Sequence, residues 1–185
     1  MSEIIPAILP KNEEDLRKKI SDLPPEINYF HLDILEQQDV WIDGIKQNFE
    51  VHLMVEKPEV IIKTWVERGA KRIIIHSLGG ETAKSGAEIG LGVEVGIPLE
   101  TIFPLIPKVN FVHLMSIDAL GTQGDDFEPI IFDRIKKVKE KFPQMLISVD
   151  GGINTDNYQA LEGVGADRLV VGSGFKNLWN SLTKK

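Results

Sequence analysis

The feature that most constrains the fold is a series of eight short apolar segments that alternate with helix-like segments along the chain. Most are nearly continuous in Val, Ile and Leu, as in 72–76 and 145–149. Strands of this kind are buried on both faces, which is typical of a parallel sheet covered by helices. Eight of them indicate an α/β fold of the closed (β/α)8 TIM-barrel type rather than an open doubly wound sheet.

The chain is short for such a barrel, with 185 residues, whereas barrels typically have about 250 and rarely fewer than about 200. The shortfall has a visible place between His76 and Leu91, where the glycine-rich stretch 78–86 leaves room for about one helical turn. We therefore expect a compact barrel whose fourth helix is shortened or missing. No Pro/Gly/Ser-rich linker divides residues 1–185, so a single domain is expected. A short helix is expected at Trp41–Asn48.

Composition excludes several classes of function. The net charge of −7 argues against a surface for nucleic acid or anionic membrane. No apolar stretch approaches the roughly 18 residues that span a bilayer, and the N-terminus lacks the features of a signal peptide. The cytoplasm is therefore the expected location. The absence of Cys excludes disulfides, Cys-ligated zinc and thiol catalysis.

Four polar residues close apolar runs at predicted strand ends, where an unpaired imidazole or carboxylate is costly to bury: His31, Asp33, His52 and Asp150. Two positions apart on one strand, His31 and Asp33 point to the same face. Together the four predict a site for one divalent metal ion, with Zn, Mn or Fe(II) as suitable metals. Either His alone is also compatible with a satisfied core histidine. His76 and His113 have no partner that the sequence identifies, and we treat them as structural.

Asp33 and Asp150 lie on nearly opposite strands of an eight-stranded ring. A substrate across the barrel mouth would have one carboxylate on each side, an arrangement that suits removing a proton from one face of a carbon and returning it on the other. A metal bound to the adjacent oxygens would stabilise the charge formed between the two steps. Met54 and Met115, at strand ends, can shield this centre or simply fill the core. The sequence 51–54 recurs at 112–115, which chance explains as well as half-barrel symmetry does.

Glycine-rich loops follow the last two predicted strands, with Gly151 and Gly152 after the seventh and Gly172 and Ser173 after the eighth. These loops, with a helix N-terminus, are the usual phosphate site of a barrel. Glycine lets backbone N–H groups approach an anion closely. The alternative is that each motif is a plain turn.

The segment 120–127 follows the sixth strand and can form a mobile lid over a substrate. Its candidate substrate contacts are Gly121, Gln123 and Gly124. The alternative is a solvated loop that caps the next helix through Asp125 or Asp126.

These motifs, taken in order, resemble the ribulose-phosphate 3-epimerase family over almost the whole chain. The matching segments are His31-Leu32-Asp33, His52-Leu53-Met54, Met115-Ser116, Gly121-Thr122-Gln123-Gly124, Asp150-Gly151-Gly152 and Gly172-Ser173. The resemblance implies a divalent metal held by the two His and two Asp residues at the strand ends. It implies that Asp33 and Asp150 are the acid/base pair. It also implies a substrate phosphate on Gly151, Gly152, Gly172 and Ser173.

The chain departs from the family pattern at positions around the substrate. Ala7 stands where the family usually has Ser, and the family's Met-Asp-Gly is replaced by Leu35-Glu36-Gln37. Its Asn-Pro after strand five becomes Glu94-Val95, and its Asn-Pro-Gly loop becomes 118–121. The metal and proton-transfer positions match while these positions differ, so substrate identity is less constrained than reaction type.

The expected function is metal-dependent epimerisation of a phosphorylated ketose at the carbon next to the ketone, with ribulose 5-phosphate to xylulose 5-phosphate as the first substrate pair. The alternatives are a non-catalytic sugar-phosphate-binding barrel and a related phosphosugar lyase or isomerase. An aldol-type or decarboxylating reaction tends to need a Lys near the carbonyl, and none stands at a predicted strand end. A shortened helix would expose apolar surface that a second subunit can cover, so a homo-oligomer is compatible with the sequence.

Overall fold

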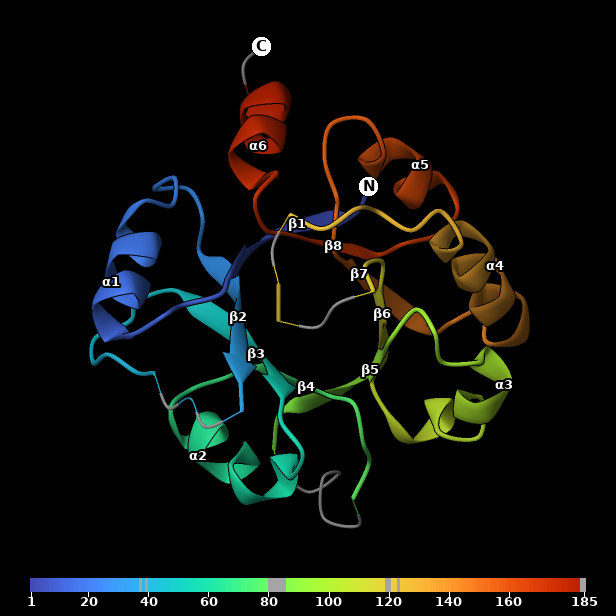
Figure 1. Cartoon of the computed structure of the whole chain (residues 1–185), viewed down its shortest axis with the longest axis horizontal. Helices are drawn as coiled ribbons and strands as arrows, with labels where there is room; N and C mark the ends of the chain where they lie inside the picture. The colour runs from blue at the N-terminus through green and yellow to red at the C-terminus, as the bar shows by residue number, and fades with distance from the viewer. Residues whose placement is uncertain (37, 39, 80–85, 119–120, 123, 184–185) are drawn as a thin grey trace.

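Eight parallel strands close into a barrel in the computed structural model, and each pairs with its neighbours in sequence, with β8 returning to β1 (Figure 1). The structure describes residues 1–185 apart from 37, 39, 80–85, 119–120, 123 and 184–185. The strands are β1 Glu3–Ile8, β2 Tyr29–Leu35, β3 Asn48–Met54, β4 Arg72–Ile75, β5 Glu88–Val93, β6 Phe111–Met115, β7 Leu146–Asp150 and β8 Arg168–Val171. The predicted (β/α)8 barrel is confirmed.

Helices surround the barrel on its outside (Figure 1). They are α1 Glu13–Ser21, α2 Ile62–Glu67, α3 Leu99–Ile102, α4 Ile131–Lys141, α5 Tyr158–Gly163 and α6 Phe175–Thr183, with short 3-10 helices η1 Pro58–Val60 and η3 Ile106–Lys108. At the start of α1, the backbone N–H of Asp15 donates to the Asn12 side chain at 2.9 Å, which satisfies a free amide of the first turn. Among the helices of the described residues, none is both long and apolar enough to cross a membrane.

The connection between β2 and β3 is irregular in its described residues, so the short helix predicted at Trp41–Asn48 is wrong. Asn48 already belongs to β3. Val40 and Ile42 are both buried, with 7% and 8% of their surface exposed. Residues two positions apart do not lie on the same face of a helix, so this pattern fits an extended segment. Gly44 then turns the chain with φ of +79°.

The connection between β4 and β5 carries no helix in its described residues, 76–79 and 86–87. The predicted shortening of the fourth helix falls largely on residues 80–85, which lie outside the described residues. The outward-facing Ile73 and Ile75 of β4 are nevertheless fully buried, and Leu91 of β5 is 1% exposed. At these three positions the strands therefore present no exposed apolar surface.

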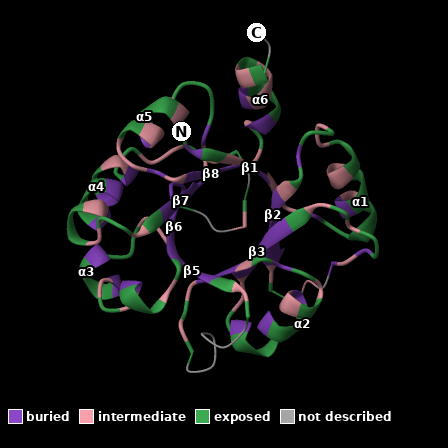
Figure 2. Cartoon of the chain, turned by 180° about the vertical axis from the view of Figure 1, so that it is seen from behind, coloured by how far each residue is buried: buried purple, intermediate pink, exposed green. Residues whose placement is uncertain are grey.

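The strands divide the core into an outer apolar shell and an unusually polar interior. Leu32 and Ile34 of β2 point outward into the shell between strands and helices, whereas His31 and Asp33 point inward. Seen from behind, the strands are mostly buried and the exposed residues lie mainly on the helices and loops (Figure 2). Inward positions of a parallel barrel therefore hold the polar side chains on which the site depends.

A layer of ion pairs fills the interior at the amino ends of the strands. Arg72 Nη1 lies 3.2 Å from Glu50 Oε2, and Arg72 Nε lies 3.3 Å from Glu88 Oε2. Arg168 Nε lies 3.6 Å from Glu3 Oε2. We call these five residues the basal layer: Glu3, Glu50, Arg72, Glu88 and Arg168. Because this layer fills that end, the opening for a ligand lies at the carboxyl ends of the strands.

Gly90 of β5 provides a test of the packing in this interior. A Cβ at Gly90 would lie 2.4 Å from the ring of Phe111, which is fully buried and cannot move aside freely. We expect Gly90→Ala to lower the free energy of unfolding by about 1–3 kcal/mol, measured by denaturant unfolding. The matched control is Gly96→Ala, where nothing lies within 4 Å of the added Cβ. Equal stability of the two variants would contradict this account.

Candidate metal centre and substrate pocket

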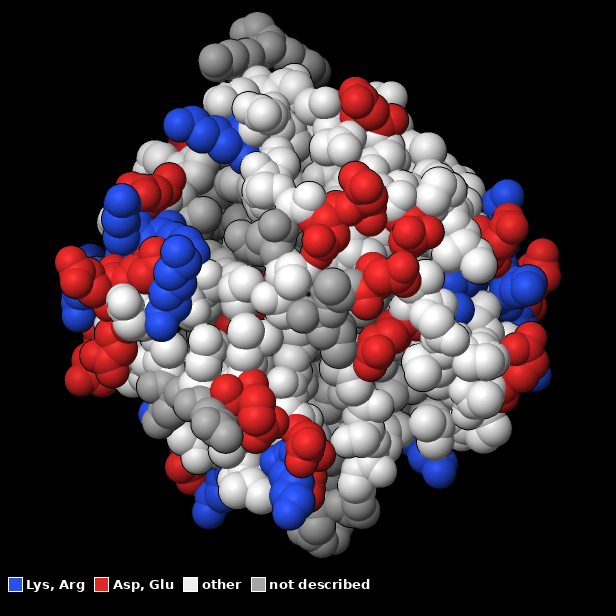
Figure 3. Space-filling view, in the orientation of Figure 1, with Lys and Arg blue, Asp and Glu red and all other residues white. Residues whose placement is uncertain are grey.

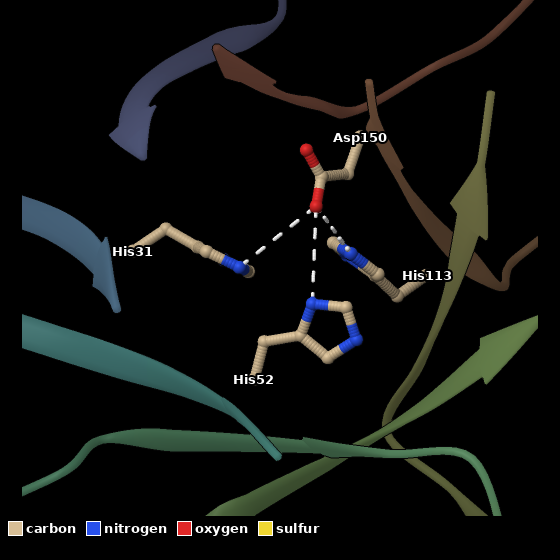
Figure 4. A group of neighbouring side chains, drawn as sticks. All are labelled: His31, His52, His113 and Asp150. Atoms are coloured by element: carbon tan, nitrogen blue, oxygen red, sulfur yellow. Dashed lines mark hydrogen bonds and ion pairs between the residues drawn. The ribbon is translucent and has the colours of Figure 1, made fainter. Parts of the chain in front are cut away.

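Three imidazoles and one carboxylate point toward one another inside the ring of strands (Figure 4). They are His31 on β2, His52 on β3, His113 on β6 and Asp150 on β7, and one ligand atom from each lies within 4.8 Å of the others. The rings of His31 and His113 stack at 5.4 Å, and His52 meets both rings edge-on. Because these residues occupy inward positions on four strands, barrel closure brings them to one place.

Asp33 completes the cluster from above His31 on the same strand. Its Oδ1 lies 3.1 Å from His31 Nε2 and 3.3 Å from His52 Nδ1. Asp150 Oδ2 lies 3.9 Å from His31 Nε2 and 3.8 Å from His52 Nδ1. The structure thus brings together all four side chains that the sequence indicated as metal ligands.

Sequence reasoning left His113 without a partner, and the structure gives it two. Its Nε2 lies 3.3 Å from Asp150 Oδ2 and its Nδ1 lies 3.1 Å from Ser148 Oγ. Because a carboxylate only accepts, Nε2–H donates to Asp150 and Nδ1 accepts from the Ser148 hydroxyl. Burial and then the charge of His31 lower the pKa of His113 to about 3, so the ring is neutral as this pattern requires. The repeat of 51–54 at 112–115 was the available signal, since it places His113 where His52 stands.

The outer nitrogens of the other two imidazoles are also held. His31 Nδ1 donates to Glu50 Oε1 at 2.8 Å. His52 Nε2 lies 2.8 Å from His76 Nε2, and His76 Nδ1 lies 3.6 Å from Glu94 Oε1. His76, which we treated as structural, therefore orients His52. Such contacts fix the ring and the tautomer of a metal-binding histidine.

These residues fit a divalent metal ion. His52 Nδ1 is buried without a hydrogen-bond partner and faces two carboxylates, which is the state of a nitrogen that offers its lone pair to a cation. Ligands at about 2.0–2.2 Å from a common ion are at most about 4.4 Å apart. The separations of Asp33 and Asp150 from His31 and His52 run from 3.1 to 3.9 Å and meet this condition. Imidazole and carboxylate donors suit Zn, Mn and Fe(II).

The two carboxylates have opposite acid–base character. Burial and then the negative charges of Asp33 and Glu50 raise the pKa of Asp150 to about 6, although the histidines oppose this. Burial would also raise the pKa of Asp33, but the charge and hydrogen bond of His31 hold it below its ordinary value. Paired groups whose pKa values are pushed apart in this way are suited to separate acid and base roles.

A pocket lies above the cluster and contains nearly all the other residues that the sequence indicated. Its predicted members are Asp33, Met54, Met115, Gly121, Gly124, Asp150, Gly151, Gly152, Gly172 and Ser173. Ala7, Ile117, Thr122, Ile153 and Gly174 complete the lining. His31 and His52 are fully buried beneath it. Gln123 lies outside the described residues.

The segment after β6 packs against both sides of the pocket. A Cβ on Gly152, whose φ is +62°, would meet the backbone of Phe127 at 2.9 Å. Gly121 approaches Leu35 of β2 so closely that a Cβ would lie 2.5 Å from Leu35 Cδ2. Helix α4 begins without a side-chain cap, so the alternative in which Asp125 or Asp126 caps it is wrong. Gly121, Thr122 and Gly124 of this segment line the pocket.

The face that bears the pocket is acidic. Figure 3 shows Asp and Glu side chains around the middle of this face and Lys and Arg mainly toward its edge. Within the described residues, the pocket lining contains no Lys or Arg. An anionic group in this pocket would therefore be held by backbone N–H groups and the N-terminus of α6, which starts directly after Gly174.

The matching family model and the related proteins indicate the same family. The model of the "Ribulose-phosphate 3 epimerase family" matches residues 3–176. A ribulose-phosphate 3-epimerase from Candida glabrata is 27% identical over 133 residues, which are 68% of this chain and 54% of that protein. One from Schizosaccharomyces pombe is 23% identical over 196 residues, covering 93% of this chain and 86% of the relative. The chain thus spans little more than half the length of the first relative.

Solved structures agree on the fold. A chain of the tryptophan synthase α2β2 complex from Pyrococcus furiosus superposes with a TM-score of 0.68 over 99% of this chain and 92% of that chain. The sequence identity is 13%, so this likeness concerns the barrel architecture alone.

If the candidate centre binds a metal ion, the ion should stabilise the folded chain against unfolding. Adding Zn, Mn or Fe(II) to metal-stripped protein should raise the thermal unfolding midpoint, because an ion bound only by the folded chain stabilises it by about 2.7 kcal/mol at roughly 100 times its Kd. Asp33→Asn should lose most of this shift. Asp133→Asn, which changes a 75% exposed carboxylate on α4, should keep it. An equal metal-induced shift in both variants would exclude Asp33 as a ligand.

Proposed function

The chain belongs to the ribulose-phosphate 3-epimerase family, and we propose that it catalyses metal-dependent epimerisation of a phosphorylated ketose at the carbon next to the ketone. Ribulose 5-phosphate and xylulose 5-phosphate are the first substrate pair to test. The observation that carries the proposal is the placement of Asp33 and Asp150, from β2 and β7, at the floor of one pocket around a shared group of histidines.

The two carboxylates are the proposed acid/base pair. A substrate carbon between them would lose its proton to one carboxylate and receive a proton from the other on the opposite face, which inverts the centre. The contrast in their pKa directions supports this division, since Asp33 favours the ionised form and Asp150 holds a proton more readily. The pocket side chains of Met54 and Met115 would keep water from the reacting carbon.

The proposed cofactor is one divalent metal ion held by His31, Asp33, His52 and Asp150, with His113 holding Asp150 in place. When bound, the ion supplies Lewis-acid stabilisation of negative charge on the substrate oxygens. In the metal-free chain, burial disfavours a charged His31, but Asp33 and Glu50 raise its pKa well above the ordinary value. Metal binding is therefore expected to displace the Nε2 proton of His31.

The substrate phosphate is proposed to rest on the backbone at Gly151, Gly152, Gly172 and Ser173. These residues line the pocket beside the start of α6, and glycine there admits close approach of an anion. The segment with Gly121 and Gly124 is proposed to cover the bound sugar. The acidic face around the pocket would favour a ligand whose phosphate is enclosed by the backbone rather than left at the mouth.

A non-catalytic sugar-phosphate-binding protein is the second candidate. Ala7 lines the pocket at the position where the resemblance leads us to expect Ser, so a polar contact to the substrate is absent there. A lyase that uses a Lys is less supported, because the described pocket lining contains none.

Solvent deuterium exchange separates these candidates. We expect wash-in at C3 of ribulose 5-phosphate with formation of xylulose 5-phosphate, followed by proton NMR with Zn, Mn or Fe(II) supplied in turn. Asp150→Asn should reduce epimerisation by a factor of 100 or more while the fold is kept, on the order of what general acid–base catalysis contributes. Asp133→Asn is the matched control and should retain full activity.

The remaining outcomes are informative. Full activity of Asp150→Asn would remove the two-base mechanism. Exchange without epimerisation would mean that one carboxylate acts and the other does not return a proton. Binding of the sugar phosphate without exchange under any metal would favour the non-catalytic candidate.

A further inference from the structure

Two buried polar side chains and the partly buried Arg72 connect the basal layer to the candidate metal centre. His31, Glu50 and Arg72 are register partners on the neighbouring strands β2, β3 and β4, and all three point into the barrel. Glu50 and His31 are fully buried. A charged residue in the middle of a buried strand requires partners for its charge and its hydrogen bonds.

Each carboxylate oxygen of Glu50 has its own partner. Oε1 accepts from His31 Nδ1 at 2.8 Å. Oε2 accepts from Arg72 Nη1 at 3.2 Å and from the Tyr29 hydroxyl at 3.4 Å. Arg can only donate and a carboxylate can only accept, so the proton between Glu50 and His31 must sit on Nδ1. The same argument puts a second proton on Nε2 in the metal-free chain, because Nε2 lies 3.1 Å from Asp33 Oδ1. Once that proton is lost, the lone pair is on Nε2, the nitrogen that faces Asp33 and Asp150.

We propose that Arg72 and Glu50 are positioning residues that fix the tautomer of His31 and so make its Nε2 available to a metal ion. The inference rests on the proposed function only in taking the cluster to be a metal site. It adds that the metal ligand His31 depends on Arg72, in the basal layer, through the carboxylate of Glu50.

The substitution Glu50→Gln tests the direction of these hydrogen bonds with almost no change in shape. The amide has one accepting oxygen and one donating nitrogen. Arg72 requires the oxygen, so the NH2 group must face His31 Nδ1, which then has to accept. The proton moves to Nε2 and blocks the metal. We expect the affinity for Zn or Co(II), measured by competition with a chromogenic chelator, to fall by about 10- to 100-fold.

Adding Arg72→Met should restore part of the metal affinity that Glu50→Gln removes. In Glu50→Gln with Arg72→Met, nothing forces the amide oxygen toward β4, and the Tyr29 hydroxyl can accept from the amide NH2. The oxygen can then accept from His31 Nδ1 again. We expect the double variant to bind metal more tightly than Glu50→Gln alone. The matched control is Glu50→Gln with Arg168→Met, because Arg168 pairs with Glu3 and Glu88 in the same basal layer. This control should bring no recovery.

The tautomer can be read directly by ¹⁵N NMR of the histidine side chains, recorded on metal-free protein along a pH titration that is continued until His31 has lost one of its two protons. We expect the His31 proton on Nδ1 in the unaltered chain and on Nε2 in Glu50→Gln. If the chain binds no metal while the tautomer changes as stated, the proposed cofactor fails and the positioning role stands. An unchanged tautomer in Glu50→Gln would overturn the positioning role. In a chain that does bind metal, so would an unchanged affinity in Glu50→Gln or equal recovery with Arg168→Met.

Discussion

The interior of the barrel depends on a single requirement, which is that every imidazole buried there has both ring nitrogens engaged or facing ligand groups. His31 is held by Glu50, His52 by His76 and His113 by Ser148, while their inner nitrogens face Asp33 and Asp150. An unsatisfied polar group at this depth is costly, so removing one partner affects more than one contact. The residues that make the candidate site are therefore also part of what specifies the interior packing.

Strand geometry makes this network possible. In a closed parallel barrel, alternate residues of every strand face the axis, and neighbouring strands place their inward residues side by side. Most barrels fill this space with bulky apolar side chains in layers. Here Ile5, Ile74, Phe111 and Val170 fill part of it, and the polar residues form a continuous path from Arg72 through Glu50 to His31. The buried ion pairs of the interior contribute little to the free energy of folding. Most of the stability therefore comes from burial of Leu, Ile and Val in the outer shell.

Sequence reasoning succeeded where one local rule determines position. The apolar runs predicted the eight strands. Polar residues at predicted strand ends identified Asp33 and Asp150, because the strand ends of a closed barrel must meet at one mouth. It missed His113, although that residue stands in the same Val-His-Leu-Met sequence as His52, because its partners Ser148 and Asp150 come from another strand and meet it only in the folded barrel. The helix expected at Trp41–Asn48 failed because contacts distant in sequence decide that segment, with Trp41 packing on Phe49 and Trp65.

The positions that match the family motifs and those that depart from them occupy different layers of the molecule. His31, Asp33, His52 and Asp150 lie on strands, where the register and the buried hydrogen bonds leave little freedom. Ala7 and Leu35 lie toward the carboxyl ends of β1 and β2; Ala7 lines the pocket and Leu35 contacts Gly121 of the segment after β6. A change at the rim can alter the shape offered to the far end of a sugar without disturbing the carboxylates beneath it. This separation is a physical reason to expect that substrate preference varies more readily in this barrel than the proton-transfer chemistry proposed for its floor.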